Sequence, residues 1–220
     1  MQPEPFSIRD QHLWLSPDRS IFWEEEKALI LSDLHFGKTG HFRKSGIAVP
    51  QSVYREDLQR LVNQIQVFKP HQLIIVGDMF HSHANKELEL FRKWRNDLDG
   101  VSIHLVKGNH DILKDDWYNN TDIAVSKTSF RLGKFCFQHD MNDCEEDEEG
   151  VAPSYLFSGH IHPGIRINGM GKQSLRFPCF YFTEAYCILP AFSRFTGAVS
   201  IEPKDGEVVF AIVNNSIIRM

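Results

Sequence analysis

Several features that would assign a protein to a common class are missing from this sequence. No apolar run approaches the length needed to cross a membrane. The first residues, Met1–Ser7, contain neither a basic region nor an apolar core, so we expect no signal peptide. The four cysteines form no Cys-x-x-Cys pair, and we interpret them as reduced and mostly buried. The sequence therefore predicts a cytoplasmic protein with no membrane contact.

The sequence also lacks an excess of positive charge. Its 24 basic residues are outnumbered by 29 acidic residues, giving a net charge of −5, so no chain-wide basic footprint indicates nucleic-acid binding. A local basic patch remains compatible with this composition. Neither a Gly-x-Gly-x-x-Gly pattern nor a P-loop occurs, which argues against a metal-free nucleotide-binding module.

The hydrophobic content of 42% is sufficient for a full core, and we interpret residues 1–220 as one domain. The first half alternates between strand and helix patterns, which predicts parallel strands joined by right-handed crossovers. The expected elements are a hairpin within 6–23, strands at 28–32, 73–76 and 101–106, and helices at 51–68 and from Ser82 to Leu98. From residue 128 onward strands dominate, which predicts a second, largely antiparallel sheet facing the first. These strands are expected at 129–132, 134–139, 155–159, 164–167, 175–182, 186–189 and 208–213.

Five of the predicted strands end in the same way, with Asp, Asn or His just beyond an apolar run. The segments are Asp33-Leu34-His35, Gly77-Asp78, Gly108-Asn109-His110-Asp111, Gln138-His139 and Gly159-His160-Ile161-His162. On an extended chain, residues two positions apart point the same way, so both histidines of the last segment can reach one site. The glycines allow sharp turns and a close approach of the backbone.

The residue types in these segments favour a transition-metal site. Mixed imidazole, carboxylate and amide ligands suit Mn, Fe or Zn better than Ca or Mg. Two divalent ions about 4 Å apart can share one hydroxide that attacks phosphorus. Asp33 and Asp78 are the only anionic candidates, so a two-metal centre would stay net positive and attract a phosphate.

The ordered set of motifs resembles the calcineurin-like metallophosphoesterase superfamily, and the resemblance extends from Leu29 to His162. It implies a four-layer α/β/β/α sandwich (α/β, or α+β) of two mixed β-sheets flanked by helices, with two divalent metal ions. We expect manganese first, with iron or zinc as alternatives. The resemblance assigns Asp33, His35 and His162 to the first metal, Asp78 to a bridge between the metals, and Asn109, His139 and His160 to the second metal. It also implies that His110 faces the leaving-group oxygen and that Asp111 orients its ring.

Three stretches are similar to the bacterial ligase-associated DNA damage response endonuclease/phosphoesterase group. They are residues 32–50, 77–85 and 189–197. The group is associated with a DNA ligase and a helicase, so the resemblance implies a phosphodiesterase or endonuclease acting on DNA in repair. The run Gly77–His81 is also similar to the metal-bridging motif of the double-strand-break repair nucleases, where the residue matching His81 lies near the DNA phosphate.

Other candidates for substrate contact are basic residues outside these motifs. Lys38, His41, Arg43 and Lys44 lie in the loop after the first motif and are placed to contact flanking phosphates, although a solvated basic loop is an equal alternative. Arg194 lies between Phe192 and Phe195, which either stack on a base or pack beneath a loop. The acidic run 143–149 predicts a solvated loop.

Two further functions stay open from the sequence. A phosphodiesterase or phosphomonoesterase acting on a small nucleotide or other phosphorylated metabolite would use the same metal site, because selectivity resides in the loops. A non-catalytic scaffold with this fold would be expected to have lost metal ligands or His110, and all of them are present.

Overall fold

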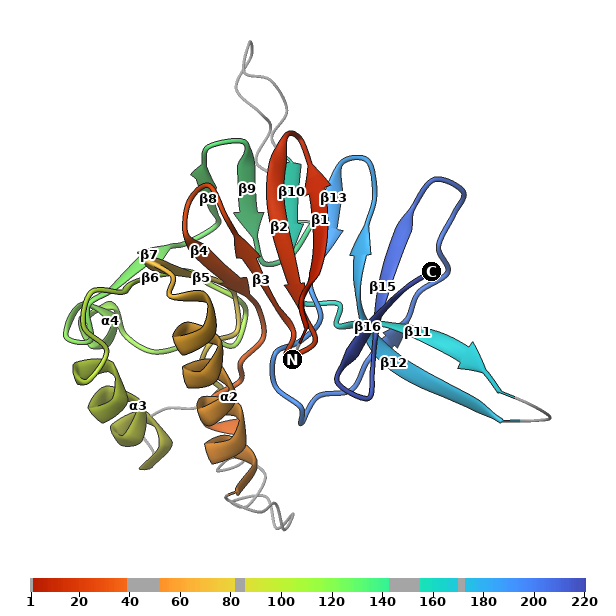
Figure 1. The fold of residues 1–220 in the computed structure, drawn as a ribbon. Helices are drawn as coiled ribbons and strands as arrows, with labels where there is room; N and C mark the ends of the chain where they lie inside the picture. Colours follow the sequence, from red (N-terminus) through yellow and green to blue (C-terminus); the bar gives the residue numbers. More distant parts are fainter. Residues whose placement is uncertain (1, 39–51, 82–85, 143–154, 170–172) are drawn as a thin grey trace.

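The computed structural model describes residues 2–38, 52–81, 86–142, 155–169 and 173–220 of the chain. It contains two mixed β-sheets with helices beside them (Figure 1). The predicted sandwich of two mixed sheets flanked by helices is confirmed. No helix in the described part of the chain is both long and apolar enough to cross a membrane.

The first sheet has seven strands in the order β1-β2-β3-β4-β5-β6-β7. Strands β4 (Ala28–Leu31), β5 (Gln72–Val76), β6 (Ser102–Val106) and β7 (Ile123–Ser126) pair in parallel, as the alternation of strand and helix predicted. The helices are α2 (Ser52–Phe68), α3 (Lys86–Asn96) and α4 (Asp115–Asn119). Strand β7 and helix α4 are short and were not predicted.

The N-terminal region contains one strand more than the predicted hairpin. Strands β1 (Glu4–Ile8), β2 (Gln11–Ser16) and β3 (Ser20–Trp23) form an antiparallel meander. The additional turn lies at Arg9 and Asp10, whose φ angles are +52° and +58°. Two successive positive φ values are typical of a two-residue type I′ turn, which usually has Asn-Gly or Asp-Gly in sequence. Arg-Asp lacks that signal, so the first turn was missed.

The second sheet is mixed: five of its strand pairings are antiparallel, in keeping with the prediction, and three are parallel. Its nine strands include the main path β14-β11-β12-β13-β10-β9-β8, and β15 and β16 extend it from β12. The three central strands, β9 (Phe135–Gln138), β10 (Tyr155–Ser158) and β13 (Tyr186–Ile188), are parallel to one another. The others are β8 (Ser129–Leu132), β11 (Pro163–Asn168), β12 (Ser174–Phe182), β14 (Val199–Ser200), β15 (Val208–Val213) and β16 (Ser216–Arg219). Parallel β9 and β10 direct their carboxyl ends the same way, and that shared edge positions two of the histidine segments.

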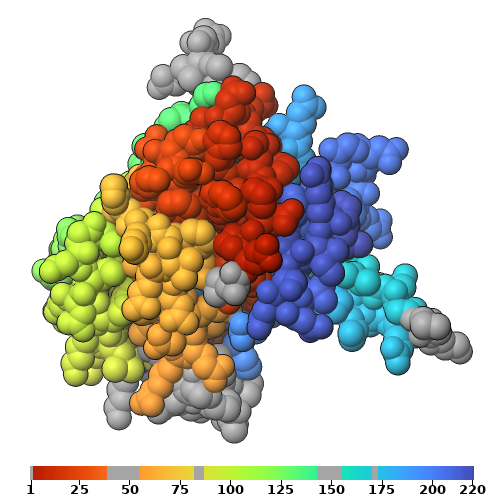
Figure 2. All heavy atoms as spheres, in the orientation of Figure 1, coloured from red at the N-terminus to blue at the C-terminus, as the bar shows by residue number. Residues whose placement is uncertain are grey.

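The two larger apolar clusters follow the layers. One packs α2, α3 and α4 onto the first sheet through residues such as Leu61, Phe91 and Tyr118. The largest aromatic residues between the sheets, including Trp23, Phe157 and Phe180, form the second cluster. Figure 2 shows the N-terminal strands in contact both with α2 and with the C-terminal strands. The two sheets are therefore held together by a continuous core, which fixes the relative position of their strand ends.

Candidate metal centre

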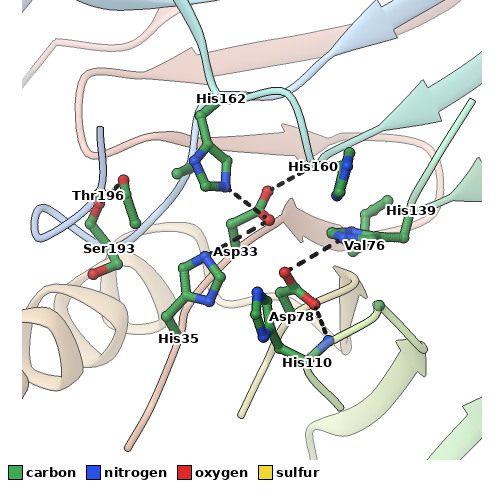
Figure 3. Close-up of polar contacts among 12 residues, drawn as sticks. Asp33, His35, Val76, Asp78, His110, His139, His160, His162, Ser193 and Thr196 are labelled. Carbon is green, nitrogen blue, oxygen red and sulfur yellow. Dashed lines mark hydrogen bonds and ion pairs between the residues drawn. The ribbon is translucent and has the colours of Figure 1, made fainter. Parts of the chain in front are cut away.

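The five polar strand-end segments of the two sheets meet at one place (Figure 3). Asp33 follows β4, Asp78 follows β5, and His139 follows β9. Backbone hydrogen bonds join the loops: Asp33 N donates to Gly77 O at 3.1 Å, and Gly159 N donates to His139 O at 3.2 Å. The site is thus built where parallel strands end, which is the usual location of ligand sites in open α/β sheets.

Five side chains of this cluster are attached to unusual backbone. The φ angles are +54° at Asp33, +50° at His35, +51° at Asp78, +64° at His160 and +53° at His162. Non-glycine residues adopt this left-handed region uncommonly and at a cost of about 1–3 kcal/mol each. Backbone strain that recurs at five neighbouring polar residues indicates a functional site.

Three glycines make room for the same side chains. A Cβ atom on Gly77 would lie 1.9 Å from His139 Nδ1, and one on Gly108 would lie 2.2 Å from Asp78 Oδ1. A Cβ atom on Gly159 would lie 2.7 Å from Asp33 Oδ2. The predicted close approach of the backbone at these three glycines is therefore present, and any larger residue would displace a polar side chain of the cluster.

Asp33, His35 and His162 form one group able to hold a metal ion. His162 Nε2 lies 3.1 Å from Asp33 Oδ1, and His35 Nε2 lies 4.0 Å from the same oxygen. Burial lowers the pKa of His35 to about 3, although Asp33 opposes the shift. The His35 imidazole is therefore neutral at physiological pH, which is the form that binds a metal.

Asp33, Asp78 and His139 form the second such group. His139 Nε2 lies 3.5 Å from Asp78 Oδ2, and His139 Nδ1 lies 3.1 Å from the carbonyl oxygen of Val76. Burial disfavours charge on both partners, but their mutual attraction outweighs it: the pKa of Asp78 is lowered to about 2 and that of His139 raised to about 9. Asp33 belongs to both groups, and Asp78, the predicted bridge, belongs to the second.

Several buried polar atoms at the centre of the cluster make no hydrogen bond, although some lie within ion-pair distance of one another. Among the described residues these atoms are Asp33 Oδ1, both ring nitrogens of His35, His139 Nε2 and His162 Nε2. A buried polar atom left without a partner costs about 1–3 kcal/mol. Imidazole nitrogens and a carboxylate oxygen that converge without partners are the donor set expected for a Mn, Fe or Zn site. The residues present therefore fit a metal ion.

His110 lies at the rim of the cluster beside His81. Their ring centroids are 4.1 Å apart, and the His35 ring lies 5.6 Å from each of them. The backbone N–H of His110 donates to Asp78 Oδ1 at 2.9 Å. His110 is therefore fixed next to the two candidate metal groups and belongs to neither of them.

Asp111 is buried, and its carboxylate holds the surrounding loops. Its oxygens accept hydrogen bonds from the backbone N–H groups of Phe80 and Gly108, each at 2.9 Å, and burial raises its pKa to about 6. The sequence predicted that Asp111 orients the His110 ring. Its hydrogen bonds with Phe80 N and Gly108 N fix the backbone next to that ring.

The remaining predicted ligands lie at the outer side of the cluster. His160 donates its backbone N–H to Asp33 Oδ2 at 3.2 Å, and its ring lies 5.1 Å from that of His139. Asn109 is exposed in the loop between Gly108 and His110. Asp140, which the sequence analysis missed, lies 3.8 Å from His160 Nε2. Its position directly after His139 was the only available signal.

The basic loop after the first motif is described only in part. His41, Arg43 and Lys44 lie outside the described residues, as do Ser82 and the acidic run 143–149. Lys38 is described and half-buried. Burial lowers the pKa of its ammonium group, while the nearby carboxylates of Asp33 and Asp78 act in the opposite direction.

The segment 191–196 passes beside Asp33. Phe192 N donates to Ser32 O at 2.8 Å, and Ser193 N donates to Asp33 O at 3.1 Å. Phe192 is fully buried and stacks on the guanidinium group of Arg60, so it packs beneath the loop and does not reach a base. Arg194 lies on the α2 side of this segment, 3.8 Å from Asp18.

The fold and the cluster at its strand ends define a candidate metal-binding site, and comparisons with known proteins specify the class of protein. The calcineurin-like phosphoesterase family model matches residues 27–149, more than half of the chain. The solved structure of Pseudomonas putida nuclease MPE is similar over the whole of both chains, with 30% identity and a TM-score of 0.81. A search of curated proteins found no match. The chain belongs to the calcineurin-like phosphoesterase family and is a metal-dependent phosphoester hydrolase.

Proposed function

We propose that this protein is a dinuclear phosphodiesterase that cleaves DNA. The observation that carries the proposal is the convergence of unpartnered imidazole and carboxylate atoms from both sheets on one point. Asp33, His35 and His162 would hold the first ion and Asn109, His139 and His160 the second, with Asp78 between them. The manganese assignment rests on the mixed nitrogen and oxygen donors.

When bound, the two ions would supply the nucleophile and neutralise charge on the phosphoryl oxygens. The other steps fall to residues of the chain. His110, held by Asp78 and packed on His81, would protonate or stabilise the leaving-group oxygen. Asp111 would keep that loop in place through its two backbone contacts. His81 would contact the phosphate from the same side, since its ring lies against that of His110.

Two observations support DNA as the substrate over a small phosphorylated metabolite. The similar solved structure is that of a nuclease, and the similarity covers the whole chain. The three stretches shared with the ligase-associated repair group support a role in DNA repair beside a ligase and a helicase. The basic candidates His41, Arg43 and Lys44 would contact phosphates away from the reacting one, whereas Arg194 faces Asp18 on the α2 side.

The test is a comparison of substrates with manganese-loaded protein. The substrates are bis(p-nitrophenyl) phosphate, p-nitrophenyl phosphate, and labelled single- and double-stranded DNA, with Asp78→Asn as the contamination control. We expect hydrolysis of the diester and of DNA, both lost in the variant. Monoester hydrolysis without DNA cleavage would instead identify a small-molecule phosphatase.

A further inference from the structure

A cavity opens directly beside His162, and none of the other candidate metal ligands lines it. Its volume is about 260 Å³. Two arginines, Arg19 and Arg176, line it together with His162, and the rest of the lining is Pro163, Pro178, Ala191, Thr196, Gly197 and Ala198. No carboxylate is among these residues, so the arginines give the cavity a positive charge that no lining residue offsets. Such a cavity favours an anion.

Arg176 is held in a defined position on strand β12. Its Nη1 donates to the carbonyl oxygen of Ala198 at 2.6 Å. Its aliphatic stem lies over Gly164, where an added Cβ would come within 3.0 Å of the Arg176 Cγ and Cδ atoms. Although Arg176 is exposed, its guanidinium group is thus fixed at the cavity, and a fixed planar donor binds phosphate with little further ordering cost.

The cavity wall is connected to the candidate metal centre by backbone hydrogen bonds. Val199 N donates to His162 O at 2.9 Å, next to the residue that receives the Arg176 bond. On the opposite wall, Arg19 Nη1 donates to the carbonyl oxygens of Ala191 and Ser193, and Ser193 N in turn donates to Asp33 O. The two arginines are therefore positioned relative to the groups that would hold the scissile phosphate.

A third arginine extends this positive surface along the hairpin. Arg166 on β11 lies directly opposite Arg176 in the antiparallel register, and both are exposed. Like charges at directly opposite positions destabilise a sheet. The β11–β12 hairpin projects from the body of the molecule (Figure 1), so this pair is open to a bound chain. A bound anion between the two guanidinium groups would relieve their repulsion.

We propose that the cavity of Arg19, Arg176 and His162 binds the phosphate next to the scissile phosphate of a single DNA strand, and that Arg166 contacts the strand beyond it. This inference rests on the proposed nuclease function and adds the path that the strand takes. The substrate is then a polynucleotide, because a single-phosphate ester would leave the arginine cavity empty.

Another, larger cavity lies on the other side of segment 191–193, and it is less suited to bind a phosphate. Its volume is about 690 Å³, and α2 and Arg194 line it. Asp18 and Glu56 are part of its lining, and Arg194 is already 3.8 Å from Asp18. Arg55 and Arg60 also line it, but Arg60 is paired with Asp57 at 3.0 Å, so carboxylates offset much of the positive charge of this cavity.

The test uses the full-length protein with Arg176→Gln, which removes the charge and keeps the stem. Arg131→Gln is the matched control, because Arg131 is exposed on β8 at the other edge of the same sheet. Binding of a fluorescent single-stranded oligonucleotide is measured by anisotropy over a range of salt concentrations, in the Asp78→Asn background to prevent cleavage. Turnover of bis(p-nitrophenyl) phosphate and of the oligonucleotide is measured with manganese in the wild-type background.

We expect Arg176→Gln to weaken oligonucleotide binding and its kcat/KM by about tenfold, as for loss of one charge-assisted phosphate contact. The slope of log Kd against log salt should fall by about 0.7, the value for one phosphate contact to a single strand. Turnover of the small diester should be unchanged, and Arg131→Gln should resemble wild type in every assay.

Three results would overturn the inference. If Arg176→Gln lowers kcat/KM equally for the oligonucleotide and for the small diester, Arg176 acts through His162 and not on a flanking phosphate. If wild-type protein cleaves DNA and Arg176→Gln cleaves it equally well, the strand takes another path and only this inference fails. If wild-type protein hydrolyses the small diester and neither binds nor cleaves DNA, the proposed nuclease function fails along with it.

Discussion

Two buried polar clusters lie on either side of segment 191–193, and they differ in how their charges are satisfied. On the α2 side, Asp57 and Arg60 form an ion pair at 3.0 Å, and the side chains of Asp18, Gln64 and Ser20 are linked by hydrogen bonds of 3.0 and 2.9 Å. On the other side, Asp33 Oδ1 and the ring nitrogens of His35 make no hydrogen bond within the described structure. Arg60 also leaves Nε and Nη1 without a hydrogen bond, but its Nη2 is held by Asp57 and the Phe192 carbonyl oxygen, whereas both ring nitrogens of His35 are without a hydrogen bond. Both clusters are almost completely buried.

The difference separates a structural role from a functional one. Arg60 donates to Asp57 and to the carbonyl oxygen of Phe192, so it holds the segment that lies beside Asp33. Burial lowers the pKa of Arg60 to about 10, which still leaves it charged and able to do so. Charges that are paired with each other stabilise a shape, whereas polar groups that converge without partners are positioned for a ligand.

We expect the largest effect from replacing Asp78, in the cluster of candidate metal ligands, with Asn. The substitution removes the negative charge of a carboxylate in the second candidate metal group while keeping the shape of the side chain. We expect kcat for the diester to fall about a thousandfold, since roughly 4 kcal/mol of transition-state stabilisation would be lost. Steady-state kinetics at matched manganese content measures this, and near-normal turnover would rule out the mechanism.

A pair of stability measurements tests the structural side of the comparison. Asp57→Asn leaves the buried Arg60 without its anion and should lower the free energy of unfolding by about 3 kcal/mol. Asp33→Asn should lower it by only about 1 kcal/mol in metal-free protein, because Asn tolerates the positive φ of +54° and its amide oxygen can still accept the His160 N–H, so that the main loss is the 3.1 Å contact with His162. Guanidinium unfolding with EDTA present gives both values. Equal losses would mean that the two clusters do not differ in role.

His110→Gln tests the role of His110, which lies at the rim of the cluster of candidate metal ligands. Loss of a proton donor at the leaving group should lower kcat by about a hundredfold, with little change in metal content. Kinetics combined with elemental analysis separates the two effects. A variant that loses bound metal would show His110 to be a ligand, contrary to the role proposed for it.

The sequence predicted the parts of the molecule that follow local patterns. The strands that carry Asp33, Asp78 and His139 are short apolar runs ending in a polar residue, and these runs specify both the strand and the place of the side chain. The parallel pairing of β9, β10 and β13 escaped prediction because strand order depends on contacts between segments far apart in sequence. No local sequence pattern indicates whether the segments between those strands connect them as parallel or as antiparallel neighbours.

The contributions of Arg19 and Arg176 could not be predicted for a related reason. Arg19 lies in the turn between β2 and β3, and Arg176 lies near the start of β12, more than 150 residues away. They share a cavity with His162 only because segment 191–198 passes between the sheets' strand ends. The same holds for Asp111, whose contacts with Phe80 and Gly108 depend on the neighbouring loops.

The number of metal ions bound per chain tests the central claim most directly. Metal-free protein is titrated with Mn²⁺ by isothermal calorimetry, and the bound metal is then counted by elemental analysis, alongside the Asp33→Asn variant. The account predicts two ions per chain in the wild type and fewer in the variant, since Asp33 belongs to both candidate groups. A wild-type protein that binds one ion or none, while remaining folded and hydrolysing the diester, would contradict the dinuclear centre.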